Sequence, residues 1–134
     1  MKKLVNEWLK AALMDLKSIE KIINDEFLTP MVAFHSHQAI EKSLKAILEL
    51  QQIKIPKIHK LQTLIDLVGI DLSEKDELLQ LLDELYIDSR YPENMGLLPY
   101  GKPTLEDAKE FYEFAQSVFD KVCEILAVDR DMLK

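Results

Sequence analysis

Apolar side chains recur every three or four residues along most of the chain. This is the spacing of one face of an α-helix. The first such stretch predicts a helix over residues 3–26. Its expected inward face consists of Val5, Leu9, Ala12, Leu16, Ile19 and Ile23, widened by Trp8 and Leu13.

A second helix is predicted from Thr29 to about Gln51, with Thr29 as the N-cap and Pro30 at the first helical position. About half of its circumference is apolar or small. That half consists of Val32, Ala33, Ser36, Ala39, Ile40, Ser43, Leu44, Ala46, Ile47 and Leu50. Because small residues let another helix approach closely, we expect this helix to be central in a bundle.

The middle of the chain predicts a connector and two further helices. Residues 52–58 form the connector, which is broken at Pro56, and a short helix follows His59 and stops at Gly69. The stretch Ser73-Glu-Lys-Asp76 resembles a capping box that opens a fourth helix to about Ser89. Expected inward positions are Leu61, Leu64, Ile65 and Val68, and then Leu78, Leu81, Leu82 and Leu85.

Residues 90–104, RYPENMGLLPYGKPT, contain most of the late Gly and Pro residues and predict a loop. Thr104 is the expected N-cap of a fifth helix that ends near Val128. Its inward stripe is Ala108, Phe111, Ala115, Val118, Phe119, Val122 and Leu126. The pattern therefore predicts an all-α fold, an up-down helical bundle of four long helices and one short helix. It also predicts a single domain over residues 1–134.

Composition agrees with a globular helical protein. Hydrophobic residues are 48% and charged residues 31%, with only 3 Gly and 5 Pro. No apolar run reaches the roughly 18 residues of a membrane span. The N-terminal stretch lacks the apolar core of a signal peptide, and the single Cys123 cannot form an internal disulfide. We therefore expect a cytoplasmic protein in which Cys123 is a buried thiol.

Net charge is −7, which argues against general nucleic-acid binding. Residues 1–60 carry 10 Lys and 7 acidic residues, whereas residues 61–134 carry 7 Lys and Arg and 17 acidic residues. A bound polyanion should therefore contact the first half. The basic cluster at 54–60 has few aromatic neighbours, so it is weak support for RNA binding.

The sequence offers little support for a metal or a cofactor. The three glycines match no phosphate-binding loop, and one Cys makes a zinc site implausible. His35 and His37 are two residues apart on a helix and point about 200° apart, so they cannot chelate one ion. His37 is expected to be a partly buried, hydrogen-bonded histidine.

The polar arc of the second helix has two interpretations, which the residues leave open. Glu41 and Lys45 are four residues apart and could form an ordinary surface ion pair. Alternatively, they line a functional face together with Gln38 and Lys42. Phe34 shares this arc, and an aromatic residue among charges suggests a contact surface for a second subunit or a ligand.

Several blocks together resemble one known family, the HEPN (higher eukaryotes and prokaryotes nucleotide-binding) domain family. They are Trp8, Ala12 and Asp15-Leu16; FHSHQAIEKSLKAIL at 34–48; His59-Lys-Leu61 with Leu64; Ser89-Arg90-Tyr91-Pro92; and Thr104-Leu-Glu-Asp-Ala108. The resemblance covers nearly the whole chain. It implies a helical bundle that often forms homodimers and a minimal nucleotidyltransferase as partner, frequently in toxin–antitoxin modules. Residues expected to bind a ligand or partner are Phe34, His37, Gln38, Glu41, Lys42, Lys45, Arg90 and Tyr91.

Many members of the family are metal-independent ribonucleases with an Arg, four to six residues, and then a His. Arg stabilises phosphate charge, and His moves protons during attack by the RNA 2′-hydroxyl. Arg90 stands in the Arg position, but positions 95–97 hold Met95, Gly96 and Leu97. The chain is therefore expected to be a binding module without catalysis, with a nucleotide or RNA as a candidate ligand. Two alternatives stay open: a ribonuclease that uses Arg90 with an unconventional base, and a protein-interaction module without nucleotide.

Overall fold

The computed structural model describes residues 2–88 and 101–133, and every regular element in this part of the chain is helical. The elements are α1 (Lys2–Ile22), η1 (Glu26–Leu28), α2 (Thr29–Leu50), α3 (Leu61–Val68), η2 (Ser73–Lys75), α4 (Asp76–Asp88), α5 (Leu105–Ile125) and η3 (Arg130–Leu133). The predicted all-α bundle is thus confirmed. None of the described helices is both long and apolar enough to cross a membrane.

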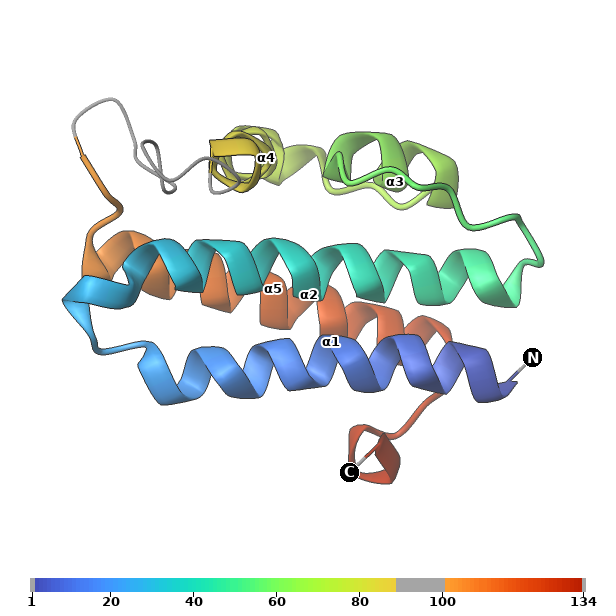
Figure 1. Cartoon of the computed structure of the whole chain (residues 1–134). Coiled ribbons are helices and arrows are strands. Elements are labelled where there is room, and N and C mark those ends of the chain that lie inside the picture. Colours follow the sequence, from blue (N-terminus) through green and yellow to red (C-terminus); the bar gives the residue numbers. More distant parts are fainter. Residues whose placement is uncertain (1, 89–100, 134) are drawn as a thin grey trace.

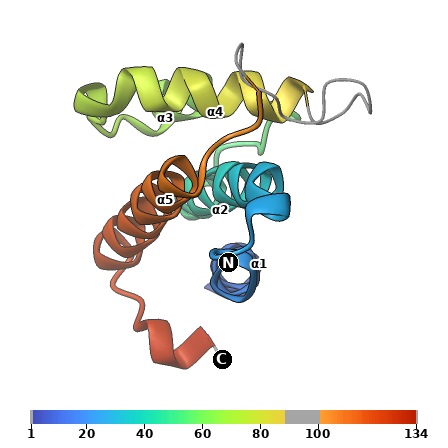
Figure 2. The ribbon, with the colours of Figure 1, turned by 90° about the vertical axis from the view of Figure 1, so that its left-hand side faces the viewer.

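Helix α2 is central, as its small residues predicted, because it packs against α1, α3, α4 and α5 (Figure 1). Helix α1 runs antiparallel to α2, whereas α5 runs in the same direction as α2. Helix α4 is seen nearly end-on in Figure 1 and lengthwise in Figure 2. It therefore crosses the direction that α1, α2 and α5 share. The pair α3 and α4 therefore covers the face of α2 that lies opposite α1.

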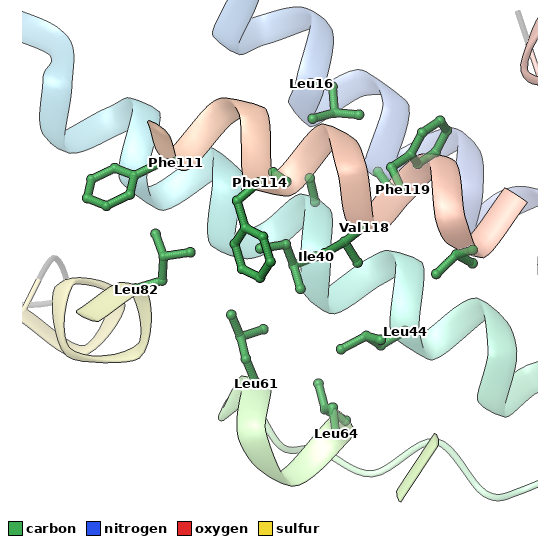
Figure 3. Packing of buried hydrophobic residues seen from close by; sticks show 14 of the residues in the cluster. Leu16, Ile40, Leu44, Leu61, Leu64, Leu82, Phe111, Phe114, Val118 and Phe119 are labelled. Carbon is green, nitrogen blue, oxygen red and sulfur yellow. The ribbon is translucent and has the colours of Figure 1, made fainter. Parts of the chain in front are cut away.

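The buried apolar side chains form one contiguous cluster to which every α-helix contributes. Figure 3 shows Ile40 of α2 beside Phe114 of α5, with Leu61 of α3 and Leu82 of α4 directed toward them. Most predicted inward positions are buried. Leu50 was predicted inward and is 43% exposed, because it is the last residue of α2. Buried positions that the pattern missed include Leu48, Leu79 and Phe114, whereas Cys123 is buried as expected.

The boundary between the first two helices differs from the prediction. Helix α1 ends at Ile22, and a separate 3-10 turn leads directly into α2. Leu28 is the N-cap of α2 and makes no side-chain cap bond, so the predicted Thr29 cap is wrong. The Thr29 hydroxyl instead donates to the Pro103 carbonyl at 2.6 Å. This buried bond joins the start of α2 to the residues that lead into α5.

The predicted capping box at Ser73 is also wrong, because the Ser73 hydroxyl is engaged elsewhere. It donates to Asp71 Oδ1 at 2.7 Å, and the Ser73 amide donates to the same oxygen at 3.0 Å. These bonds hold the pKa of the exposed Asp71 carboxyl below its usual value. Residues 73–75 form a 3-10 turn that precedes α4. Gly69 ends α3 in the left-handed conformation (φ 83°), as predicted.

The predicted cap of the fifth helix is confirmed. Thr104 Oγ1 accepts a hydrogen bond from the Asp107 amide, and Asp107 Oδ2 accepts one from the Thr104 amide, both at 3.0 Å. This reciprocal pair satisfies two backbone donors at the start of α5. The helix ends at Ile125, slightly before the predicted Val128.

Replacing Thr104 by Ala should lower the free energy of unfolding by about 1 kcal/mol, because the Asp107 amide loses its acceptor. The Thr104→Ser variant keeps the hydroxyl and serves as the matched control. Urea denaturation followed by circular dichroism measures both. Equal midpoints for wild type and the Ala variant would contradict the role given to this cap.

Candidate functional site

The carboxylate of Asp83 on α4 connects three helices. Asp83 Oδ1 accepts a hydrogen bond from His37 Nε2 of α2 at 3.0 Å. Both carboxylate oxygens accept a hydrogen bond from the Leu61 amide, at 2.9 and 3.2 Å. Lys60, the N-cap residue of α3, makes no side-chain cap bond. Asp83 therefore caps α3 from a different helix, while it also binds the buried His37.

Glu41 is the second buried carboxylate of the site. Its Oε2 accepts a hydrogen bond from Lys45 Nζ at 3.0 Å, and its Oε1 accepts one from His59 Nδ1 at 3.1 Å. Glu41 is 4% exposed and Lys45 is 5% exposed, so the interpretation as a surface ion pair is wrong. The Lys45 ammonium also lies 5.7 Å from the centroid of the Trp8 ring, a cation–π distance. The pair is therefore enclosed between α1 and the connector that carries His59.

Aromatic rings pack beside these carboxylates. The Tyr86 ring of α4 stacks on His37, with centroids 4.2 Å apart and an interplanar angle of 10°. Phe34 lies 5.9 Å from Tyr86 and His59 lies 5.5 Å from it. We call His37, Glu41, Lys45, His59, Asp83 and Tyr86 the histidine–carboxylate network. His37 was expected to be partly buried and hydrogen-bonded; it is hydrogen-bonded to Asp83 and fully buried.

Asp83 and Tyr86 were missed as site residues, although the sequence carries a signal for both. They lie four and seven residues after Leu79, on the buried side of α4. A polar residue within an apolar helical stripe must find a partner, since an unpaired buried carboxylate is strongly unfavourable. The partner histidine lies 46 residues away, and no spacing rule predicts that pairing.

Lys42 lies on a different side of α2 from the network. Its Nζ donates to Asp15 Oδ2 of α1 at 2.8 Å, and His35 Nδ1 donates to Asp15 Oδ1 at 2.8 Å. His35 and His37 therefore face different helices, α1 and α4. Phe34, another predicted site residue, lies beside Tyr86 of the network.

Gln38 is partly buried, and its Oε1 has no hydrogen-bond partner within the part of the chain that the structure describes. Arg90 and Tyr91 lie outside the described residues.

A cavity of about 810 Å³ lies between the start of α3 and one side of α4. Three members of the network, His59, Asp83 and Tyr86, line it. Further along its walls are Lys60, Gln62, Asp76, Gln80 and Glu84. The network thus forms one wall of a concave site large enough for a ligand or for side chains of a partner.

Two other candidates for chemistry are a metal site and the thiol of Cys123. Across residues 2–88 and 101–133, no three His, Cys, Asp or Glu side chains converge as ligands for a metal ion. Cys123 is buried in α5, and burial, followed by the charge of Asp120, raises the pKa of its thiol to about 11. A thiol with this pKa stays protonated at neutral pH and is a poor nucleophile.

Comparison with known families gives a match to the HEPN domain over residues 5–126. The chain therefore belongs to the HEPN domain family, as the sequence blocks indicated. No curated protein and no solved structure matches it.

Removing the Asp83 carboxylate should destabilise the fold, because His37 and the first amide of α3 both lose an acceptor. We expect Asp83→Ala to lower the free energy of unfolding by about 1–3 kcal/mol. The neighbouring Glu84 is exposed, so Glu84→Ala is the matched control and should stay within about 0.5 kcal/mol of wild type. Urea unfolding monitored by Trp8 fluorescence measures both, and an equal effect of the two substitutions would contradict the assigned role.

Proposed function

We propose that this HEPN domain is a non-catalytic binding module, that it forms a homodimer, and that its partner is a minimal nucleotidyltransferase in a toxin–antitoxin-like pair. The observation that carries the first part is the absence of a His at positions 95–97, where the ribonuclease motif that begins at Arg90 would place its proton-transfer residue. His35 is bound to Asp15, and the fully buried His37 is bound to Asp83. Neither of these two histidines lines the cavity.

The lysines support a protein partner more strongly than a nucleotide. Lys42 and Lys45, which were expected to contact a ligand, each donate to a carboxylate at 3.0 Å or less. A phosphate group would have to compete with these carboxylates for the same ammonium groups. Exposed apolar side chains favour a protein contact instead: Phe27 of η1 is 79% exposed, and Met31 in the first turn of α2 is 38% exposed.

Co-expression with a minimal nucleotidyltransferase encoded in the same genome should give a complex that survives size-exclusion chromatography at micromolar concentration. The free domain alone should elute as a dimer, with its mass measured by light scattering. Replacement of Phe27 by Ser should weaken the complex, whereas Phe119→Leu in the core should not. Separate elution of the two wild-type proteins would overturn the proposed partnership, and a strictly monomeric free domain would overturn the proposed dimer.

One specific observation favours a second candidate function, a metal-independent ribonuclease. The His59 side chain is 43% exposed and lines the cavity, while the buried Glu41 carboxylate, 3.1 Å from Nδ1, orients the ring. A base held by an orienting carboxylate is the arrangement of a general acid–base catalyst. His59 would supply the proton transfer that positions 95–97 lack, with Arg90 as the residue that contacts phosphate.

If the second candidate is correct, the purified domain cleaves RNA in the presence of EDTA. His59→Ala should then slow cleavage by about 100-fold or more, as loss of a general base does, and Arg90→Ala should abolish it. His35→Ala is the control, because His35 lies on the α1 side of α2, bound to Asp15. Absence of cleavage by wild type, or equal rates for wild type and His59→Ala, would rule out this candidate.

A further inference from the structure

We propose that the cavity between α3 and α4 binds an arginine side chain presented by a partner protein. The inference deepens the proposed binding function and rests on it. It starts from a concave space of about 810 Å³ with polar and aromatic walls. A space of this size accommodates several side chains of an inserted segment.

The charges on the cavity wall favour a cationic occupant. Asp76, Asp83 and Glu84 line it, and Lys60 is the one lysine among the described lining residues. Asp83 accepts hydrogen bonds from His37 and the Leu61 amide, whereas the contact of Glu84 among the described residues is a 3.5 Å hydrogen bond from the Gln80 side-chain amide. Phosphate groups would be repelled by this wall, and a guanidinium would be attracted to it.

The geometry favours a planar guanidinium over a compact ammonium. Tyr86 forms an aromatic wall, and its stack on His37 holds the ring in place. Asp76 and Glu84 lie eight residues apart on α4, a rise of about 12 Å, so the cavity offers a guanidinium two separate carboxylates. Guanidinium groups combine bidentate bonds to a carboxylate with packing on aromatic rings, which an ammonium does less well. Gln62 and Gln80 add neutral acceptors beside the carboxylates.

The test is an NMR titration of the full chain with a capped pentapeptide that has one arginine among glycines. The matched probe replaces the arginine by citrulline, which has nearly the same shape and no charge. We expect the arginine peptide to shift the side-chain amide signals of Gln62 and Gln80, and the citrulline peptide to leave them unchanged. AMP and a short RNA are titrated in parallel.

Two variants locate the binding. The double variant Asp76→Asn with Glu84→Gln should bind the arginine peptide about tenfold more weakly, because hydrogen bonds to charged groups contribute that much. Glu77→Gln removes an exposed charge from the same helix outside the cavity and should bind within about twofold of wild type, as surface charges contribute little. Thermal melting of each variant verifies that it is folded.

Equal responses to arginine and citrulline peptides, or equal affinity of the double variant and wild type, would overturn the inference. Shifts of the same signals by AMP or RNA, with none by the arginine peptide, would also overturn it. If the nucleotidyltransferase complex is stable but the arginine peptide shifts no signals, the site is rejected and the proposed partnership stands. Arginine binding without that complex would keep the site and reject the named partner.

Discussion

Burial of the Asp83 carboxylate constrains this structure more than any other single interaction. A carboxylate that is removed from water is strongly unfavourable unless donors replace the lost solvent. Three donor contacts do so here, two from the Leu61 amide and one from His37. Because these donors belong to α3 and α2, satisfying one charge on α4 fixes the positions of all three helices.

The same constraint explains why the site lies where it does. Helix α3 has only 8 residues and lacks a cap of its own, so it depends on a neighbour to satisfy its first amide. His59 lies two residues before that amide and reaches Glu41 on α2. The connector before α3 is thereby held on both sides, by Asp83 at Leu61 and by Glu41 at His59. The cavity is the space left beside this fixed connector.

The fold could be predicted from the sequence because helical periodicity, Gly69 and Thr104 are local signals. The site could be predicted only in part. Phe34, His37, Glu41 and Lys45, which were predicted as site residues on the second helix, lie in or beside the network, whereas Lys42 was grouped with them and pairs with Asp15 on α1. A helical wheel places these residues on one arc and does not say which neighbouring helix each one meets. Asp83 and Tyr86 joined the site through tertiary packing, which no local spacing encodes.

The hydrogen bond from Thr29 to Pro103 also has a consequence for the order in which the protein folds. It spans 74 residues and places the starts of α2 and α5 side by side. The antiparallel α1 and α2 are adjacent in sequence and can associate early, since closing a short loop loses little entropy. The side of α2 that α5 covers stays exposed until α5 has been synthesised. During translation the nascent chain therefore exposes that apolar surface until most of the protein has been made, which leaves time for a chaperone to bind it.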